Sequence, residues 1–144
     1  MSLYGEYDPD NIFGKILRGE IPCIKVYEDD VVLAFMDVFP QSEGHTLVIP
    51  KATGTRNFLE LPAEHVGPYM ERVQKVANAV VKGLTPDGVV ITQFNGEVAG
   101  QTVFHLHFHI IPRRDGEPIG RHASGEMANT DELKQLAEKI QAAF

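Results

Sequence analysis

The feature that most constrains the fold is the segment Val103–Pro112, in which histidine alternates with aromatic and aliphatic residues. Its three histidines stand at alternate positions, His105, His107 and His109. Strict alternation is typical of a half-buried β-strand, because successive side chains point to opposite faces. We therefore expect a strand over residues 103–110 with all three imidazoles on one face. Pro112 has no N–H for a sheet ladder, and we expect it to end this strand.

Such a row of imidazoles supports two kinds of chemistry. The first is a metal site, but residues two apart on a strand lie about 7 Å apart and residues four apart about 13 Å. Two of the three rings can share a zinc ion, whereas all three cannot without ligands from elsewhere. The second is catalysis by neutral imidazole, with one ring as the nucleophile and its neighbours orienting it and stabilising charge.

The residues just before the histidines favour the second chemistry. Gly100, Gln101 and Thr102 form a short approach whose backbone N–H groups and hydroxyl are able to cradle a phosphate. An anion cradle beside a row of histidines suits phosphoryl transfer better than it suits a metal cage.

Length, charge and cysteine content limit the remaining possibilities. A chain of 144 residues fits one domain and is long enough to bury a core. Its net charge of −7 argues against a nucleic-acid polymer as partner, but allows a small anionic ligand at a locally positive site. The single cysteine, Cys23, cannot form an internal disulfide, and no apolar segment reaches membrane length. We therefore predict a cytoplasmic protein with no membrane partner.

Periodicity along the chain predicts an α+β fold. Helical spacing indicates three helices, over residues 12–17, 63–82 and 130–143. Apolar and β-branched runs indicate four more strands, the last of them buried, over residues 24–28, 31–36, 45–50 and 88–94. Gly83 is suited to end the long helix, and the polar residues 1–10 are expected to form a loosely held tail. The result is a mostly antiparallel sheet with one long central helix and a C-terminal helix.

The histidine segment resembles a known family. His105–Ile111 fits the signature His-x-His-x-His-x-x, with hydrophobic x, of the histidine triad (HIT) superfamily, and Ala99–Val103 resembles that family's approach to the signature. Residues 11–22 resemble the nucleoside phosphoramidase branch. The resemblance implies a single two-layer HIT-like domain with its core at residues 11–114, followed by a C-terminal loop and helix at 115–144. It also implies a homodimer.

Matching positions imply a nucleotide site. The family lines its base pocket with apolar side chains, which correspond here to Ile12, Phe13, Ile16, Phe35, Val38 and Leu47. Asp37 matches an aspartate that accepts hydrogen bonds from both ribose hydroxyls, a role that suits a carboxylate with two oxygens. An asparagine matched by Asn95 helps to hold phosphate in the family. On their own, Asp37 would be interpreted as a strand-end cap and Asn95 as a turn residue.

The resemblance also implies a mechanism. His107 is expected to attack the phosphorus next to the nucleoside and to form a covalent nucleotidyl-histidine, which water then hydrolyses. His109 and backbone amides of the phosphate cradle would stabilise charge on the phosphoryl oxygens. His105 would orient His107 through a hydrogen bond, and His45 matches a fourth histidine close to the triad.

The sequence narrows the choice of leaving group only in part. An adenosine phosphoramidate and a dinucleoside polyphosphate present the same nucleoside monophosphate half to such a pocket. The phosphoramidase-like N-terminal segment tilts the prediction toward small phosphoramidates.

Many bacterial relatives bind a structural zinc ion that this chain is not expected to hold. They have cysteines where Asn11 and Gly14 stand, and a histidine where Thr53 stands. Because these ligands are absent, we expect no cofactor, and we interpret Cys23 as a small buried hydrophobe.

Two alternatives to a metal-free hydrolase remain open. One is a metalloenzyme that uses His105 and His107 with His45 as a third ligand. The other is a nucleotide-binding sensor or scaffold without turnover, which the intact triad disfavours.

Overall fold

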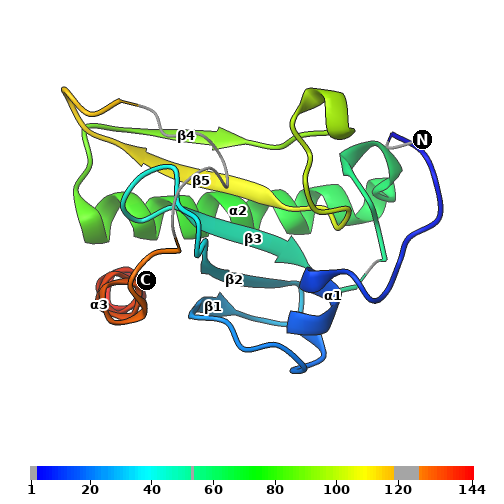
Figure 1. Ribbon diagram of the computed structural model, residues 1–144, viewed down its shortest axis with the longest axis horizontal. Helices are drawn as coiled ribbons and strands as arrows, with labels where there is room; N and C mark the ends of the chain where they lie inside the picture. The colour runs from blue at the N-terminus through cyan, green and yellow to red at the C-terminus, as the bar shows by residue number, and fades with distance from the viewer. Residues whose placement is uncertain (1–2, 53, 119–126) are drawn as a thin grey trace.

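The computed structural model describes residues 3–52, 54–118 and 127–144, and it confirms the α+β architecture expected from the sequence. In these residues a five-stranded antiparallel sheet has the order β1-β2-β3-β5-β4 (Figure 1). The strands are β1 Lys25–Glu28, β2 Val32–Met36, β3 Thr46–Pro50, β4 Gly88–Thr92 and β5 Phe108–Arg113. The α-helices are α1 Ile12–Leu17, α2 Ala63–Leu84 and α3 Thr130–Gln141, with short 3-10 helices η1 Phe58–Glu60 and η2 Glu97–Ala99.

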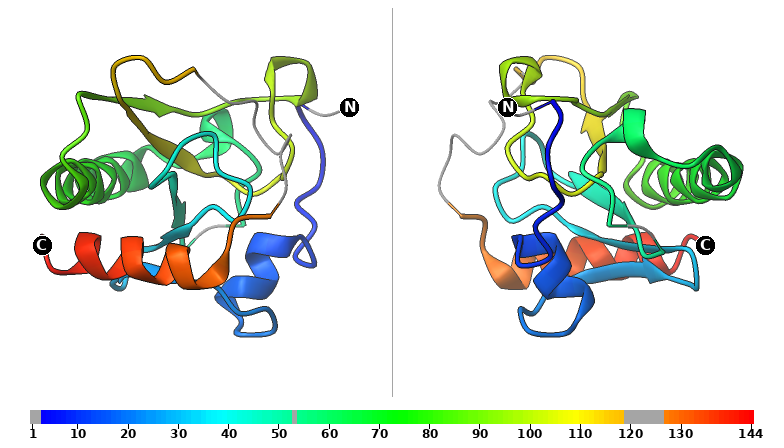
Figure 2. Two further views of the ribbon diagram at one scale, coloured as in Figure 1. Left: turned by 60° about the vertical axis from the view of Figure 1, so that its left-hand side comes forward. Right: turned by 90° about the vertical axis from the view of Figure 1, so that its right-hand side faces the viewer.

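The sheet separates two cores of different size. Strands β2 and β3 are buried on both faces, which explains why neither shows an alternating pattern in the sequence. One face packs against α2 and α3 through a large cluster that includes Val32, Val48 and Ile110. The other face packs against α1 through a small cluster made of Phe13, Leu33, Phe35, Leu47 and Ile49. Helix α2 and the N-terminal segment consequently lie on opposite sides of the sheet (Figure 2, right).

The prediction that Gly83 ends the long helix is wrong. Helix α2 continues to Leu84, and its C-cap is Thr85 in the left-handed region, with φ of 49°. Gly83 instead faces α3, where an added Cβ would lie 2.7 Å from the carbonyl oxygen of Lys139. A glycine is required there because the two helices approach closely. No helix within the described ranges is both long enough and apolar enough to cross a membrane.

Helix α1, which forms one wall of the candidate site, begins and ends as the sequence indicates. The side chain of Asn11 accepts a hydrogen bond of 2.9 Å from the N–H of Gly14 and caps the first turn. Gly19, with φ of 78°, follows the last turn, where the N–H groups of Gly19 and Glu20 donate to carbonyls of the preceding turn.

Strand β4 differs from the expected buried strand over residues 88–94. It ends at Thr92 and forms an edge of the sheet, and no other strand of the described chain pairs with its outer side. Val90 and Ile91 on this edge are 38% and 48% exposed. The opposite edge, β1, is covered by α3, whose Gln141 side chain donates to the carbonyl of Lys25.

The histidine segment is not one continuous strand, contrary to the expectation for residues 103–110. Strand β5 begins at Phe108, so that His109 is the member of the triad that lies in the sheet. Before Phe108, backbone groups that would pair with a neighbouring strand in a continuous β-strand have other hydrogen-bond partners. The N–H of Leu106 donates to the carbonyl of Thr55 at 2.9 Å, and the carbonyl of His105 accepts from a histidine ring.

Pro112 does not end this strand either. It lies inside β5, opposite Val89 of β4, and its carbonyl accepts a hydrogen bond from the hydroxyl of Ser42. The nitrogen and carbonyl of a strand residue point to the same side. The Pro112 nitrogen therefore faces the loop that precedes β3, the loop of Ser42, where the ladder needs no donor.

Residues 3–10 are docked rather than loosely held. They run along the segment that leads into η1 before they enter α1 (Figure 1). The side-chain amide of Asn57 donates to the carbonyl of Leu3 at 2.8 Å, and the hydroxyl of Tyr7 lies 2.7 Å from the ring of His105. The N-terminal segment therefore helps to hold the residues of the site in place.

Candidate active site

A cavity of about 280 Å³ lies between α1 and the sheet, on the side of the small core. The apolar residues expected to form a base pocket all line it, namely Ile12, Phe13, Ile16, Phe35, Val38 and Leu47. Asp37, Thr102 and His107 line it as well and supply its polar groups. Cys23 is partly buried in the same wall, and burial raises the pKa of its thiol. The cavity combines an apolar surface suited to a flat ring with a few polar groups suited to a sugar phosphate.

Strand register places the apolar wall next to the triad. Phe35 pairs with Leu47 across β2 and β3, and Leu47 pairs with His109 across β3 and β5. Residues paired in this way have their side chains on the same face, so the three form one row. The ring of Phe13 from α1 lies edge-on to those of Phe35 and His107, with centroids 5.5 and 5.0 Å away. One aromatic side chain therefore contacts both the apolar wall and the triad.

The main chain selects the tautomer of His107. Its Nδ1 lies 2.7 Å from the carbonyl oxygen of His105, a group that only accepts hydrogen bonds. Nδ1 therefore carries the proton of the neutral ring, and the lone pair is on Nε2. The sequence predicts that His105 orients His107 through a hydrogen bond. The structure contains such a bond, and the partner is the backbone carbonyl of His105 rather than its ring.

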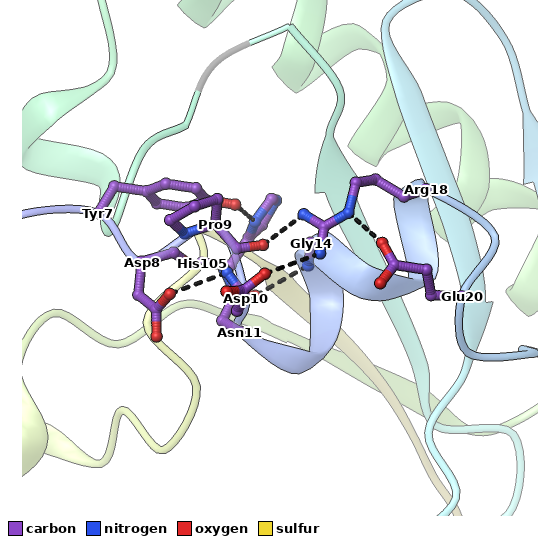
Figure 3. A network of polar contacts seen from close by, with 9 residues as sticks. All are labelled: Tyr7, Asp8, Pro9, Asp10, Asn11, Gly14, Arg18, Glu20 and His105. Carbon is purple, nitrogen blue, oxygen red and sulfur yellow. Dashed lines mark hydrogen bonds and ion pairs between the residues drawn. The ribbon is translucent and has the colours of Figure 1, made fainter.

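The ring of His105 is neutral and fixed on both sides. It is 1% exposed, and burial lowers its pKa to about 4. Nε2 lies 3.4 Å from the carbonyl of Pro50, while Nδ1 lies 2.7 Å from the hydroxyl of Tyr7 (Figure 3). Because the carbonyl only accepts, Nε2 carries the proton and the Tyr7 hydroxyl donates to Nδ1.

A second chain of hydrogen bonds sets the tautomers of His45 and His109, both of which are fully buried. The N–H of Gln41 donates to Nδ1 of His45 at 3.0 Å, so the proton of neutral His45 is on Nε2. That Nε2 lies 2.9 Å from Nδ1 of His109 and 3.5 Å from Oδ2 of Asp37. His109 therefore accepts at Nδ1 and carries its own proton on Nε2. This arrangement makes His109 a hydrogen-bond donor.

Asp37 occupies the turn that follows β2 and is 7% exposed. Its Oδ1 accepts a hydrogen bond of 2.8 Å from the N–H of Phe39, which is the cap role that its position alone suggests. The same carboxylate lines the cavity, which is the location that the family resemblance implies.

Of the four residues expected to hold phosphate, the structure places one, Thr102, in the cavity wall. The other three are outside the cavity lining, namely Asn95, Gly100 and Gln101. The N–H of Gln101 donates to the carbonyl of Gly96 at 3.0 Å, and its side-chain oxygen accepts from the N–H of Gly96 at 2.8 Å. The side-chain oxygen of Asn95 accepts from the N–H of Phe58 at 3.0 Å. In this structure these side chains therefore shape the loop that leads to the triad.

The three histidines that the metalloenzyme alternative requires do not form a metal-binding group in the described residues. Within the described part of the chain, one group of His, Cys, Asp or Glu side chains has three ligand atoms within 4.8 Å of one another: Asp37, His45 and His109. His105 and His107 are outside this group. The ligand set inferred from the sequence is therefore not assembled.

The positions at which relatives have zinc-binding cysteines have other structural roles here. Asn11 caps α1, and an added Cβ at Gly14 would lie 2.6 Å from the carbonyl oxygen of Pro9. Thr53, the third position, lies outside the described residues. The close approach of Pro9 leaves no room for a longer side chain at Gly14.

Three residues that position the triad were not predicted from the sequence: Tyr7, Gln41 and Pro50. Gln41 and Pro50 act through backbone atoms, which leave no signature in side-chain patterns. Tyr7 is 98 residues away from its partner His105. A side-chain contact over that separation produces no local periodicity, so only the structure reveals it.

The fold and the site together define a histidine-triad protein. Comparison with family models agrees, because the model described as the HIT domain matches residues 18–116. The chain belongs to the HIT domain family.

Similar proteins cover most of the chain. The solved structure of a HIT-like protein from Bartonella henselae superposes with a TM-score of 0.90 at 48% identity, covering 97% of this chain and 100% of that one. The adenosine 5′-monophosphoramidase hnt1 of Schizosaccharomyces pombe is 39% identical over 130 residues, 90% of this chain and 94% of the relative. The adenylylsulfatase HINT3 of Arabidopsis thaliana is 41% identical over 120 residues, 79% of this chain and 60% of the relative.

Proposed function

We propose that the protein is a HIT-type nucleotide hydrolase or transferase, which cleaves a nucleoside monophosphate from a phosphoramidate or a dinucleoside polyphosphate. The observation that carries this proposal is the hydrogen bond from Nδ1 of His107 to the carbonyl of His105. This bond puts the lone pair of a neutral imidazole on Nε2, in a side chain that lines the cavity. Neutral imidazole in that state is a competent nucleophile toward phosphorus.

The reaction proceeds in two steps. In the first, the Nε2 lone pair of His107 forms a bond to the phosphorus, and the bond from phosphorus to the leaving group breaks. An amine leaving group takes up a proton from solvent as it departs, and the water that attacks in the second step gives a proton back to solvent. In the second step water attacks the phosphorus, the phosphorus–nitrogen bond breaks, and its electron pair returns to Nε2. The products are the leaving group and a nucleoside monophosphate.

Other side chains stabilise the charge that develops. His109, which carries its proton on Nε2, donates a hydrogen bond to a phosphoryl oxygen in this proposal. Thr102, which lines the cavity, offers its hydroxyl as a second donor near the phosphate or the leaving group in this proposal. The apolar wall takes the base, and Asp37 takes the ribose hydroxyls.

The leaving group is best identified with a small substrate panel. Metal-free protein is assayed with adenosine phosphoramidate, adenosine 5′-phosphosulfate and a dinucleoside polyphosphate, the second being included because one relative is an adenylylsulfatase. We expect phosphoramidate to be the best substrate, in line with the resemblance of residues 11–22 and with the name of the yeast relative. Tight binding without turnover of any member would favour the sensor alternative instead.

Replacing Asp37 with alanine should weaken binding of ribonucleotides but not of their 2′,3′-dideoxy analogues. Loss of the carboxylate leaves the ribose hydroxyls without their acceptor, at a cost of about 1–3 kcal/mol. Calorimetric titration with AMP and with dideoxy-AMP measures both affinities. Asp30→Ala, an exposed aspartate in the β1–β2 turn, is the matched control. Equal weakening of the two ligands by Asp37→Ala would show that the ribose assignment is wrong.

We also propose that the protein acts as a homodimer, with the outer edge of β4 as part of the interface. An exposed edge strand with two large apolar side chains is a surface that another strand can extend. Val90 and Ile91 provide those side chains, and the fully exposed Val98 follows in η2. The partners proposed for the chain are therefore a second copy and a small nucleotide.

Placing a charge on this edge should produce a monomer. We expect Ile91→Asp to halve the mass measured by sedimentation equilibrium, because a buried and unpaired carboxylate opposes association. Leu59→Asp, on the exposed helix η1, is the control and should leave the mass unchanged. A wild-type protein that is monomeric at micromolar concentration would refute the dimer.

A further inference from the structure

The N-terminal segment brings one side chain into direct contact with the triad. Tyr7 points toward His105, with its hydroxyl 2.7 Å from Nδ1 and its ring 5.6 Å from the imidazole centroid (Figure 3). Its ring also packs against Gly54, where an added Cβ would lie 2.9 Å away. Tyr7 is therefore held from two sides.

The segment around Tyr7 is also tied to the pocket wall. The guanidinium of Arg18, at the end of α1, donates to the carbonyl of Pro9 and forms an ion pair with Asp10 at 3.1 Å. The side-chain amide of Asn11 donates to the carbonyl of Asp8 at 2.7 Å. Because α1 carries apolar residues of the cavity, the same segment connects the pocket wall to the triad (Figure 3).

The Tyr7 contact has a defined chemical effect on His105. The carbonyl of Pro50 requires a proton on Nε2, and the Tyr7 hydroxyl complements this by donating to Nδ1. Without the hydroxyl, Nδ1 would be a buried acceptor with no donor from residue 7, and the ring would gain by rotating or changing tautomer. Either change alters the packing and hydrogen bonding of the residue whose carbonyl holds His107.

We propose that Tyr7 is a positioning residue, whose hydroxyl fixes the ring of His105 and thereby the carbonyl that orients His107. Its kinetic consequence rests on the function proposed above, in which His107 is the nucleophile. Tyr7 touches neither the substrate nor the reacting atoms in this proposal, since its hydroxyl is engaged with the ring of His105.

The test compares Tyr7→Phe with Tyr4→Phe. Both variants remove one hydroxyl from the same segment, but Tyr4 is 58% exposed, and within the described chain it makes no hydrogen bond or ring contact with the triad. Tyr7→Phe retains the ring that packs against His105 and Gly54, so we expect it to fold. For Tyr7→Phe we expect kcat to fall about tenfold with KM little changed, since one oriented hydrogen bond is lost. Tyr4→Phe should match the wild type.

Nitrogen NMR of histidine-labelled protein provides a readout that a merely structural role would not move. In Tyr7→Phe the Nδ1 resonance of His105 should shift toward that of an acceptor without a hydrogen bond, and the His107 Nδ1–H signal should weaken. The pKa of His105 should rise, because the hydrogen bond from Tyr7 stabilises the neutral ring. Among the described residues, the titratable groups that face His105 are Tyr7 and His107, while Phe13 and Pro50 bring no charge.

The two proposals fail in different ways. A wild type that hydrolyses no member of the panel would refute the proposed function, while the ring resonances, which need no turnover, would still decide the role of Tyr7. Unchanged His105 and His107 resonances in Tyr7→Phe would overturn the positioning role. Shifted resonances with a kcat equal to that of Tyr4→Phe would overturn its kinetic consequence.

Discussion

Replacing His107 with alanine is expected to lower turnover by about four orders of magnitude while leaving nucleoside monophosphate binding nearly intact, because the covalent route needs the Nε2 lone pair. The apolar wall and Asp37 remain to hold the ligand. Single-turnover kinetics and calorimetric titration with AMP measure the two effects separately. His65→Ala, a partly buried position on α2 outside the cavity lining, is the control.

The covalent intermediate gives this prediction a direct chemical readout. Wild-type protein that is denatured during turnover without acid should carry one nucleotidyl group on the peptide that contains His107. Acid must be avoided because the phosphorus–nitrogen bond is acid-labile. The adduct should be absent from His107→Ala and unaffected by a chelator. Near-normal turnover by His107→Ala, or activity that a chelator abolishes, would refute the proposed mechanism.

Replacing His109 with alanine is expected to reduce kcat by about 10²–10³-fold, since it removes a hydrogen-bond donor aimed at developing charge. His45 should affect kcat through His109, because its Nε2 lies 2.9 Å from Nδ1 of His109 and sets that ring's tautomer, while its 3.5 Å approach to Oδ2 of Asp37 bears on ligand binding. We therefore expect His45→Ala to lower kcat about tenfold on its own. In a protein that already carries His109→Ala, adding His45→Ala should lower kcat almost no further.

A double-mutant cycle over the two histidines measures this dependence. The single and double variants are assayed with the same substrate, and binding of AMP checks that each variant keeps the cavity. If the fold-losses in kcat of the two single variants multiply in the double variant, His45 acts on the substrate by a route of its own. A double variant that loses less kcat than this product would support the chain of hydrogen bonds from Gln41 through His45 to His109.

The sequence predicts the elements of the fold well because most are encoded locally. The helix over residues 12–17 is specified by an Asn11 cap, an apolar stripe and Gly19, all within nine residues, and it is confirmed. The alternating histidines correctly indicate where the candidate site lies, even though their segment does not form one strand. The strand fails there because backbone groups of His105 and Leu106 bond to the His107 ring and to Thr55. Alternation of residue types carries no information about such backbone partners.

Two further differences also come from long-range contacts. The segment over residues 3–10 is polar and reads as a tail, but Tyr7 finds its partner 98 residues away. The run that forms β4 is rich in β-branched residues, which is equally typical of an interior strand and of an edge. Its position at the edge follows from sheet order, a property of the whole chain rather than of the segment.

The groups that choose the tautomers of His107 and His45 are the carbonyl of His105 and the N–H of Gln41, both of which belong to the peptide backbone. No substitution at a neighbouring side chain deletes either group. Exchanges along the cavity wall can therefore alter which base or leaving group fits, while the imidazoles keep the protonation pattern that the backbone imposes. In the proposed mechanism, the backbone therefore sets the reactivity of His107 while the cavity wall sets the choice of substrate, so a substitution in the wall can change the substrate without changing the nucleophilic nitrogen.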